Sequence, residues 1–73
     1  MSKTLWKLTS VGRKRAANIY SKEVGDPVID YLYQNKTSSV EELSTVTGKT
    51  EGEVRSYLGK LESMGIAESL GGL

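Results

Sequence analysis

The chain has 73 residues, with ten lysines and arginines against nine aspartates and glutamates, which gives a formal net charge of +1. It contains neither cysteine nor histidine, which excludes disulfides, thiolate chemistry and the common zinc sites. Because a domain of this size buries only about 60 % of its unfolded surface, we expect residues 1–73 to form one domain that self-association reinforces. No apolar run approaches the roughly 20 residues of a membrane span and no signal peptide opens the sequence, so we expect a cytoplasmic protein without a membrane partner.

The two parts of the chain differ in charge. Residues 1–25 carry six cations against one glutamate, a net charge of +5, and residues 26–73 carry four cations against eight carboxylates, a net charge of −4. A basic region on an acidic body indicates either a polyanion partner or a complementary contact between subunits. A solvated charged surface is the ordinary alternative.

The first elements are predicted to be a strand and a helix. Residues 3–9 alternate in character and predict a short strand, on which Trp6 is expected to be buried or to lie at a dimer contact. Ser10 is placed to cap a helix over residues 11–20. The exposed early turns of this helix hold three consecutive cations, where positive charge opposes the helix dipole: Arg13, Lys14 and Arg15. This unfavourable placement suggests that the charges have a use, and tertiary packing explains it equally well.

A second helix is predicted over residues 27–36. Asp26 is a good N-cap, and Pro27 suits the first helical position, where no amide donor is required. The buried stripe of this helix is expected to comprise Val28, Ile29 and Leu32, with Tyr33 as a further candidate. Tyr31 lies away from that stripe and is a candidate interface residue. A short connection through Lys36–Ser38 follows.

Residues 39–64 predict a helix-turn-helix. Ser39–Glu42 and Thr50–Glu53 both have the pattern of a capping box, in which the hydroxyl and the glutamate satisfy each other's backbone amides. Gly48 lies where the first helix must end and the chain must turn, a position that favours positive φ. Apolar residues recur at helical spacing in both segments: Val40, Leu43 and Val46, then Val54, Tyr57, Leu58 and Leu61. In such a motif the second helix most often enters the DNA major groove.

The outward face of the long helix, residues 50–64, carries unusually small residues. Gly52, Ser56, Gly59 and Ser63 fall on one stripe opposite the buried side. A glycine inside a helix costs about 1 kcal/mol relative to alanine, which suggests that a DNA strand or another helix approaches this backbone closely. A solvated face of small polar residues is the alternative. The interface candidates are therefore Gly52, Gly59 and Ser63, with Trp6 and Tyr31.

The DNA-binding candidates gather near the start of the long helix. Arg55 could contact guanine bidentately, Lys49 a phosphate, and Ser56 either. The full candidate set is Lys49, Thr50, Arg55, Ser56, Lys60, Arg13, Lys14 and Arg15. Residues 49–64 carry three cations and three glutamates, which is little charge for a surface that neutralises phosphates. The basic N-terminal set could supply the difference if it lies beside the recognition helix.

The end of the chain predicts a helix stop and a last strand. Met64-Gly65-Ile66 has the pattern of a Schellman motif, and residues 66–70 can form a strand. The N-terminal strand is the available internal partner, since an isolated strand leaves its backbone groups unpaired. The predicted fold is mainly α with a small antiparallel β pair, in the order β-α-α-α-α-β. A purely helical domain with frayed ends is the alternative.

Two segments resemble the winged-helix transcription regulators. The run V-R-S-Y-L-G-K-L-E-S-M-G-I-A, residues 54–67, resembles their recognition helix and following strand. Leu8–Arg13 (L-T-x-x-G-R) resembles a strand-to-helix junction that usually follows the wing in that superfamily. The resemblance implies a winged helix-turn-helix variant whose wing is reduced or absent.

The expected function follows from the motif and the resemblance. We expect a double-stranded DNA-binding protein, a small homodimeric transcription regulator that uses residues 50–64 as its recognition helix. The competing interpretation is a protein–protein interaction module on the same scaffold, because a fold does not fix a function. We find no nucleophile–base pair and no nucleotide-binding motif, so we expect neither an enzyme nor a bound cofactor or metal.

Overall fold

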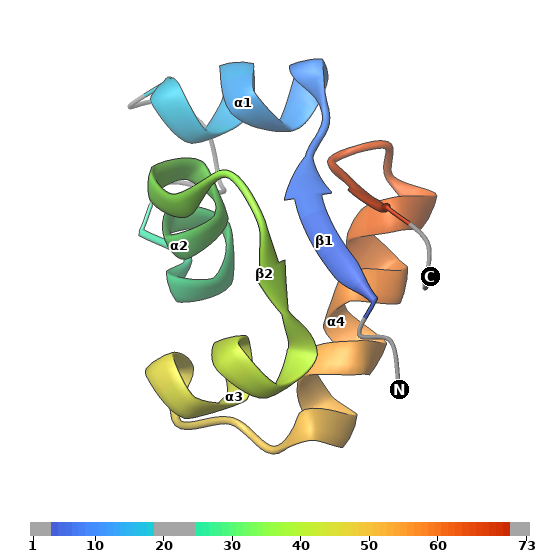
Figure 1. Ribbon diagram of the computed structural model, residues 1–73. Helices are drawn as coiled ribbons and strands as arrows, with labels where there is room; N and C mark the ends of the chain where they lie inside the picture. The colour runs from blue at the N-terminus through green and yellow to red at the C-terminus, as the bar shows by residue number, and fades with distance from the viewer. Residues whose placement is uncertain (1–3, 19–24, 71–73) are drawn as a thin grey trace.

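The computed structural model describes residues 4–18 and 25–70 (Figure 1). Over these residues the chain is mainly helical with a small antiparallel sheet, as the sequence predicts. The elements in chain order are β1 (Leu5–Leu8), α1 (Ser10–Ala17), α2 (Pro27–Asn35), β2 (Ser38–Ser39), α3 (Val40–Thr47), α4 (Glu51–Ser63) and β3 (Ala67–Ser69). The predicted element order is wrong in one respect, since it omits β2.

Among the described residues, the sheet has three strands in the order β2-β1-β3, with β1 in the middle (Figure 1). The predicted pairing of the first and last strands is confirmed, with Leu8 opposite Ala67 and Trp6 opposite Ser69. The short strand β2 pairs with the other edge of β1, where Ser39 lies opposite Leu5. The sequence does not reveal β2, because two serines show no alternation and only the pairing with β1 makes them a strand.

Helix α1 begins one residue earlier than predicted, because Thr9 and not Ser10 is its N-cap. The Thr9 amide donates to the Ile66 carbonyl (2.9 Å), and its hydroxyl oxygen accepts from the Gly12 amide (3.0 Å). The helix also ends before residue 20, since Asn18 is already extended (φ −91°, ψ 112°). The predicted residues 19 and 20 lie outside the described residues.

Helix α2 begins as predicted. The Asp26 Oδ1 atom accepts from the amides of Val28 (2.9 Å) and Ile29 (3.1 Å). The helix ends at Asn35 because Lys36 adopts φ 66° and ψ −53°, and the Thr37 amide then donates to the Asn35 carbonyl (2.7 Å). This tight turn is a rare backbone conformation for a residue with a side chain, and it delivers the chain directly into β2.

The termini of α4 follow the predicted motifs. The Thr50 amide donates to Glu53 Oε1 (3.0 Å) and the Glu53 amide donates to Thr50 Oγ1 (3.1 Å), which completes the capping box. At the other end, Gly65 has φ 76°, its amide bonds to the Glu62 carbonyl (3.0 Å), and the Ile66 amide bonds to the Leu61 carbonyl (2.9 Å). These two bonds form the predicted Schellman motif.

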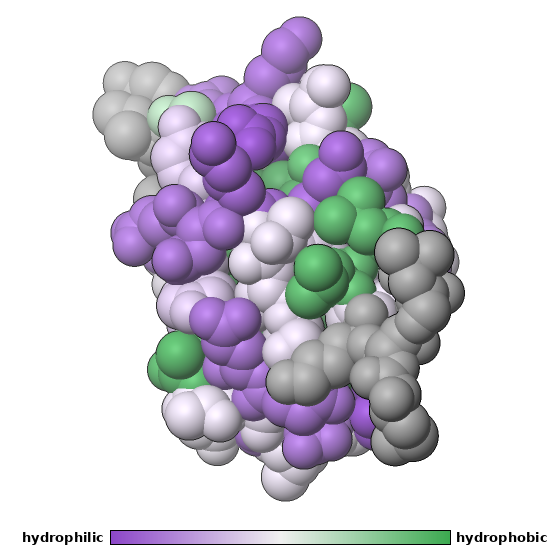
Figure 2. Space-filling model, viewed as in Figure 1, coloured by the Kyte–Doolittle hydropathy of each residue, from purple (hydrophilic) through white to green (hydrophobic). Residues whose placement is uncertain are grey.

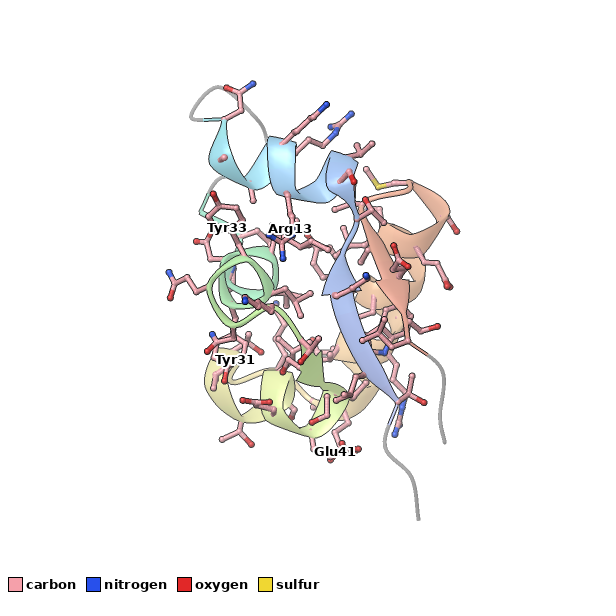
Figure 3. All side chains as sticks on the ribbon, turned by 45° about the horizontal axis from the view of Figure 1, so that its top comes forward. Arg13, Tyr31, Tyr33 and Glu41 are labelled. Carbon is pink, nitrogen blue, oxygen red and sulfur yellow. The ribbon has the colours of Figure 1, made fainter. Side chains whose placement is uncertain are left out.

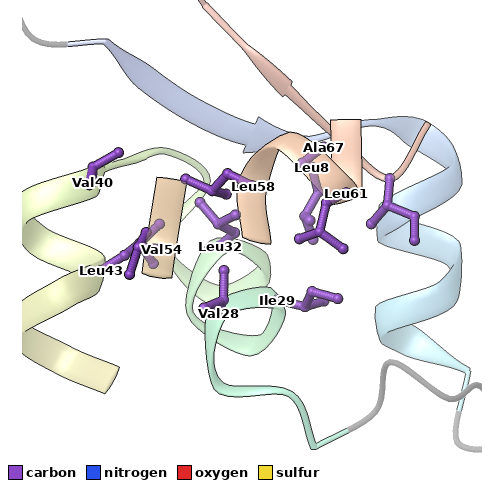
Figure 4. Packing of buried hydrophobic residues seen from close by; sticks show 11 residues of the cluster. Leu8, Val28, Ile29, Leu32, Val40, Leu43, Val54, Leu58, Leu61 and Ala67 are labelled. Atoms are coloured by element: carbon purple, nitrogen blue, oxygen red, sulfur yellow. The ribbon is translucent and has the colours of Figure 1, made fainter. Parts of the chain in front are cut away.

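One cluster of buried side chains lies between the sheet and the helices (Figure 4). Every described element except α1 and β2 contributes an apolar residue: Leu8, Val28, Ile29, Leu32, Val40, Leu43, Val54, Leu58, Leu61, Ile66 and Ala67. Val46 shares the helical spacing of Val40 and Leu43 but is 49 % exposed, and Tyr33, a candidate for the buried stripe of α2, is 44 % exposed. The short helix α3 turns Val46 past the edge of the core, so packing there ends at Leu43.

Candidate nucleic-acid interface

The turn between α3 and α4 is fixed by hydrogen bonds within a few residues. Gly48 has the left-handed conformation that the sequence predicts (φ 74°, ψ 9°), and its amide donates to the Ser44 carbonyl (3.0 Å). The Ser44 hydroxyl donates to the Lys49 carbonyl (2.6 Å) across the turn. Ser44, four residues before the glycine, therefore ties the end of α3 to the segment that leads into α4.

Helix α4 is divided into a buried side and an outward side. Val54, Leu58 and Leu61 are buried in the core. A Cβ atom added at Gly59 would meet no heavy atom within 4 Å, and one added at Gly52 would meet only Thr50 Oγ1 at 4.0 Å. Since neither glycine lies against another part of the described chain, no internal contact explains why α4 carries them.

An open groove of about 880 Å³ runs beside the outward side of α4. It brings together four of the predicted DNA-binding residues, Lys49, Thr50, Ser56 and Lys60, with the interface candidate Gly52. The start of α2 forms part of the wall through Asp26 and Pro27. The sequence identifies Asp26 only as a helix cap, and no signal in it shows that α2 begins beside α4.

The two carboxylates in the groove are satisfied within the chain. The hydroxyl of Tyr57 donates to Asp26 Oδ2, and Asp26 Oδ1 accepts the two amides at the start of α2. Hydrogen bonds from the Thr50 amide and hydroxyl, with a smaller contribution from the charge of Lys49, hold the pKa of the Glu53 carboxyl below its ordinary value. Tyr57 is thus half-buried, with its ring against the core and its hydroxyl in the groove.

The two lysines of the groove differ from its carboxylates. Among residues 4–18 and 25–70, the side chains of Lys49 and Lys60 form no hydrogen bond or ion pair. Ser56, which lies between them along α4, also has an exposed side chain. Two ammonium groups and one hydroxyl therefore remain available along one side of the helix for an external acceptor.

Arg55 does not join this groove. It lies in an ion pair with Glu51, one helical turn before it (3.6 Å), and both side chains are well exposed. An exposed pair of this kind contributes little to stability, so Arg55 is free to exchange its partner. Because it lies on a different flank of α4, it would contact a different part of a ligand from Lys49 and Lys60.

The basic residues of α1 do not lie beside the start of α4. Helix α1 packs on α2 and β1 at one end of the molecule, and α3 with the following turn lies at the opposite end (Figure 1). Figure 3 shows Arg13 reaching from α1 toward α2, on the side where Tyr33 lies. The condition under which the N-terminal cations would supplement the charge at Lys49 is therefore not met, and the predicted set falls into two separate groups.

The two aromatic interface candidates are only half exposed. The Tyr31 hydroxyl donates to Glu42 Oε2, and this bond, with slight burial and the Glu42 charge, raises the pKa of the Tyr31 hydroxyl. Glu42 Oε1 accepts from the Ser38 hydroxyl (3.1 Å), so this glutamate joins α2, β2 and α3. Trp6 is half-buried against the core. Both residues have internal roles.

Comparisons with known proteins give no relative. No family model, no curated protein and no solved structure matches this chain. Across the described ranges, no helix is both long and apolar enough to span a membrane. The same residues hold no group of three or more metal-ligating carboxylate, thiol or imidazole side chains.

Proposed function

We propose that the protein binds double-stranded DNA through the outward side of α4. One observation carries this proposal: the second helix of a helix-turn-helix presents an uncovered face whose glycines no internal contact explains. A smooth helix face allows close approach to the floor and walls of a major groove. Lys49, Ser56 and Lys60, which have exposed side chains, would contact phosphates along one edge of that groove.

We propose further that the fold is a winged helix with a changed chain order. Strand β1 lies between β2 and β3 and runs antiparallel to β3, in the place that the second strand of a wing hairpin would occupy. It leads through Leu8–Arg13 into α1, as the family's junction leads out of the wing. The Leu70 amide donates to the Leu5 carbonyl (2.8 Å), so the two strands pair without a loop that joins them directly. This arrangement supports a winged helix without the usual wing tip.

The biological role that we propose is that of a small dimeric transcription regulator. Two copies related by a two-fold axis would place their α4 helices in successive major grooves, which doubles the phosphate contacts of a weakly charged helix. Dimer formation would also bury apolar surface that this small domain leaves exposed. Exposed side chains available for such a contact include Val11, Leu5 and Leu70.

The salt dependence of binding tests the DNA proposal. The logarithm of the association constant should fall with the logarithm of the salt concentration by about 0.9 for each phosphate neutralised. Replacing both groove lysines, Lys49→Gln with Lys60→Gln, should reduce that slope by about 1.8. The control is Lys36→Gln, at the turn after α2, which should leave the slope unchanged. Absence of duplex binding at low salt would contradict the proposal.

The second candidate function is protein recognition through the same groove. Asp26 and Glu53 line it together with Lys49 and Lys60, so its formal charge is balanced. A balanced groove suits a peptide better than a phosphate chain, because phosphate binding draws its affinity from excess positive charge. Weak salt dependence of any duplex binding, with no change in the Lys49→Gln and Lys60→Gln variant, would favour this second function.

A further inference from the structure

Strand β1 turns one face to the core and the other face away from it. Leu8 is buried in the core and Trp6 packs against it. Because successive side chains of a strand point to opposite faces of the sheet, Leu5 and Lys7 lie on the outer face. Leu5 is exposed there, although it belongs to the middle strand of the sheet.

The same alternation places two residues of the neighbouring strand on the outer face. Ala67 of β3 is buried, and Glu68, which follows it, is exposed. The Leu70 amide donates to the Leu5 carbonyl (2.8 Å), so the pairing continues one residue past β3 and the exposed Leu70 lies beside Leu5. Figure 2 shows hydrophobic side chains gathered over β1 and β3.

The strand register arranges these four residues, the outer-face patch, in two rows. Leu5 and Leu70 form an apolar row, and Lys7 lies directly opposite Glu68 in the next row. Neither of these two charged side chains forms an ion pair or a hydrogen bond with a residue that the structure describes. The patch therefore presents two leucines beside one available cation and one available anion.

We propose that the outer-face patch is the contact between two copies of this chain, stacked sheet on sheet about a two-fold axis that runs between β1 and β3 and parallel to them. Such an axis places β1 of each copy over β3 of the other. Leu5 then packs on Leu70 of the second copy, and Lys7 meets Glu68 of the second copy. Each contact occurs twice, as a two-fold interface requires.

Charge complementarity identifies a second copy as the occupant of the patch. The proposed axis pairs every cation with an anion and keeps the strands aligned, as in other face-to-face sheets. A two-fold axis across the strands would instead stack β1 on β1 and bring Lys7 beside Lys7 or Leu5 of the second copy. A nucleic acid is a poor occupant, because the charge of the patch is balanced and phosphate binding needs an excess of cations.

The inference rests on the proposed function, since it supplies the contact of the proposed dimer. Helix α4 packs on β3 and contributes its buried side chains to the core, which lies on the inner face of the sheet. A contact on the outer face therefore leaves the outward side of α4 uncovered. The dimer and the DNA site occupy different surfaces and can be tested separately.

The first test exchanges the charges of the patch. Lys7→Glu and Glu68→Lys each place like charges against each other in both contacts of the dimer, which opposes association. Each variant alone should have a dimer dissociation constant about tenfold or more above that of the wild type. An equal mixture of the two variants should recover dimers, because a mixed pair has opposite charges in both contacts. A disturbance within one chain could not be repaired by mixing.

The second test removes the apolar row. Leu5→Ser and Leu70→Ser should each raise the dimer dissociation constant by about tenfold or more, because each dimer loses two buried leucines. Val46→Ser is the matched control, since Val46 is an exposed apolar residue of α3 and should leave the constant unchanged. Analytical ultracentrifugation over a range of protein concentrations measures association, and far-UV circular dichroism shows that every variant is folded.

Three results would overturn the proposal. They are a wild-type protein that stays monomeric, a mixture of the charge variants no more associated than either variant alone, and a loss of association in Val46→Ser as large as in the leucine variants. Because the test contains no DNA, its failure is distinct from failure of the proposed function. A monomer that binds duplex would refute only this contact, and a dimer that binds no duplex would refute only the DNA proposal.

Discussion

Helices α1 and α4 both expose positive charge, but different kinds of contact hold the two helices in place. Helix α4 is anchored by three buried side chains, Val54, Leu58 and Leu61, so its outward face can be small without loss of position. Helix α1 buries only Gly12 and is held mainly by backbone contacts at its start. The comparison teaches that side-chain burial positions one surface, whereas a cap and a close backbone approach position the other. The two surfaces should therefore fail under different mutations.

The Leu8–Gly12 segment explains how α1 is held. Leu8 is buried in the core, and the Thr9 hydroxyl donates to the Gly65 carbonyl (2.5 Å) while its oxygen caps α1. A Cβ atom at Gly12 would lie 2.0 Å from the Ile66 carbonyl oxygen. A side chain at position 12 is thus excluded by backbone, which cannot rotate away. The leucine, threonine and glycine of the L-T-x-x-G pattern therefore hold the start of α1 in place together.

The largest expected effect is that of Gly12→Ala. The added methyl group must push α1 away from Ile66, and overpacking of this kind costs about 1–3 kcal/mol or more. Urea unfolding should show this loss as a lower midpoint with an unchanged slope. Gly52→Ala is the matched control, because its Cβ atom has space. Equal stability of the two variants would show that α1 is not held at Gly12.

The next effect is expected at the start of α4. Thr50→Ala removes the hydroxyl half of the capping box and should cost about 1 kcal/mol of unfolding free energy. Thr45→Ala, at an exposed position inside α3, serves as the control and should be neutral or slightly stabilising. Chemical denaturation measures both. A cost at Thr45 as large as that at Thr50 would mean that the capping box contributes nothing specific.

Gly59→Ala distinguishes stability from binding, because the substitution should stabilise the protein and weaken its binding to DNA. The variant should gain about 0.5–1 kcal/mol of stability through helix propensity and a less flexible unfolded chain, since no internal atom opposes the methyl group. It should weaken duplex binding by about 1 kcal/mol or more, about fivefold in affinity. A variant that is more stable and binds DNA at full strength would show that the outward stripe is only a solvated face.

The smallest effect concerns the pH dependence of the same cap. Because its pKa is lowered in the folded protein, the Glu53 carboxyl should titrate below its ordinary value of 4.5. Its contribution to stability is present above the unfolded pKa and is lost as the pH falls through the folded pKa. Carboxyl chemical shifts followed from neutral to acidic pH give the midpoint. In Thr50→Ala the midpoint should move upward, and no movement would contradict the hydroxyl's part in the shift.

Local signals predicted the helix-turn-helix because its determinants lie within a few residues of one another. Gly48, the Thr50–Glu53 box and the Gly65 stop each act through hydrogen bonds between near neighbours. The Ser39–Glu42 pattern is similar in sequence but behaves differently. The Ser39 hydroxyl oxygen accepts from the Glu42 amide (3.2 Å), whereas the Glu42 carboxylate is engaged by Tyr31 and Ser38. Whether the glutamate of such a pattern closes the capping box therefore depends on side chains from other elements.

The features that sequence reasoning missed depend on distant contacts. Strand β2 exists because Ser38 and Ser39 lie beside β1, and Thr9 replaces Ser10 as the cap because Ile66 fixes its backbone. The wall of the groove at Asp26 and the separation of α1 from the start of α4 are likewise tertiary. The candidate site was thus predictable as a set of residues along α4, but its division into two surfaces was not.

The most direct test of the central claim, that α4 presents its outward side to DNA, is a titration of the wild-type protein with a mixed-sequence duplex at low salt, followed through its backbone amides. The account predicts shifts along residues 49–60, Gly52 and Gly59 among them, with little change at the buried residues Val54 and Leu58. It also predicts that raising the salt concentration reverses these shifts. A duplex that binds and leaves residues 49–60 unperturbed would contradict the claim.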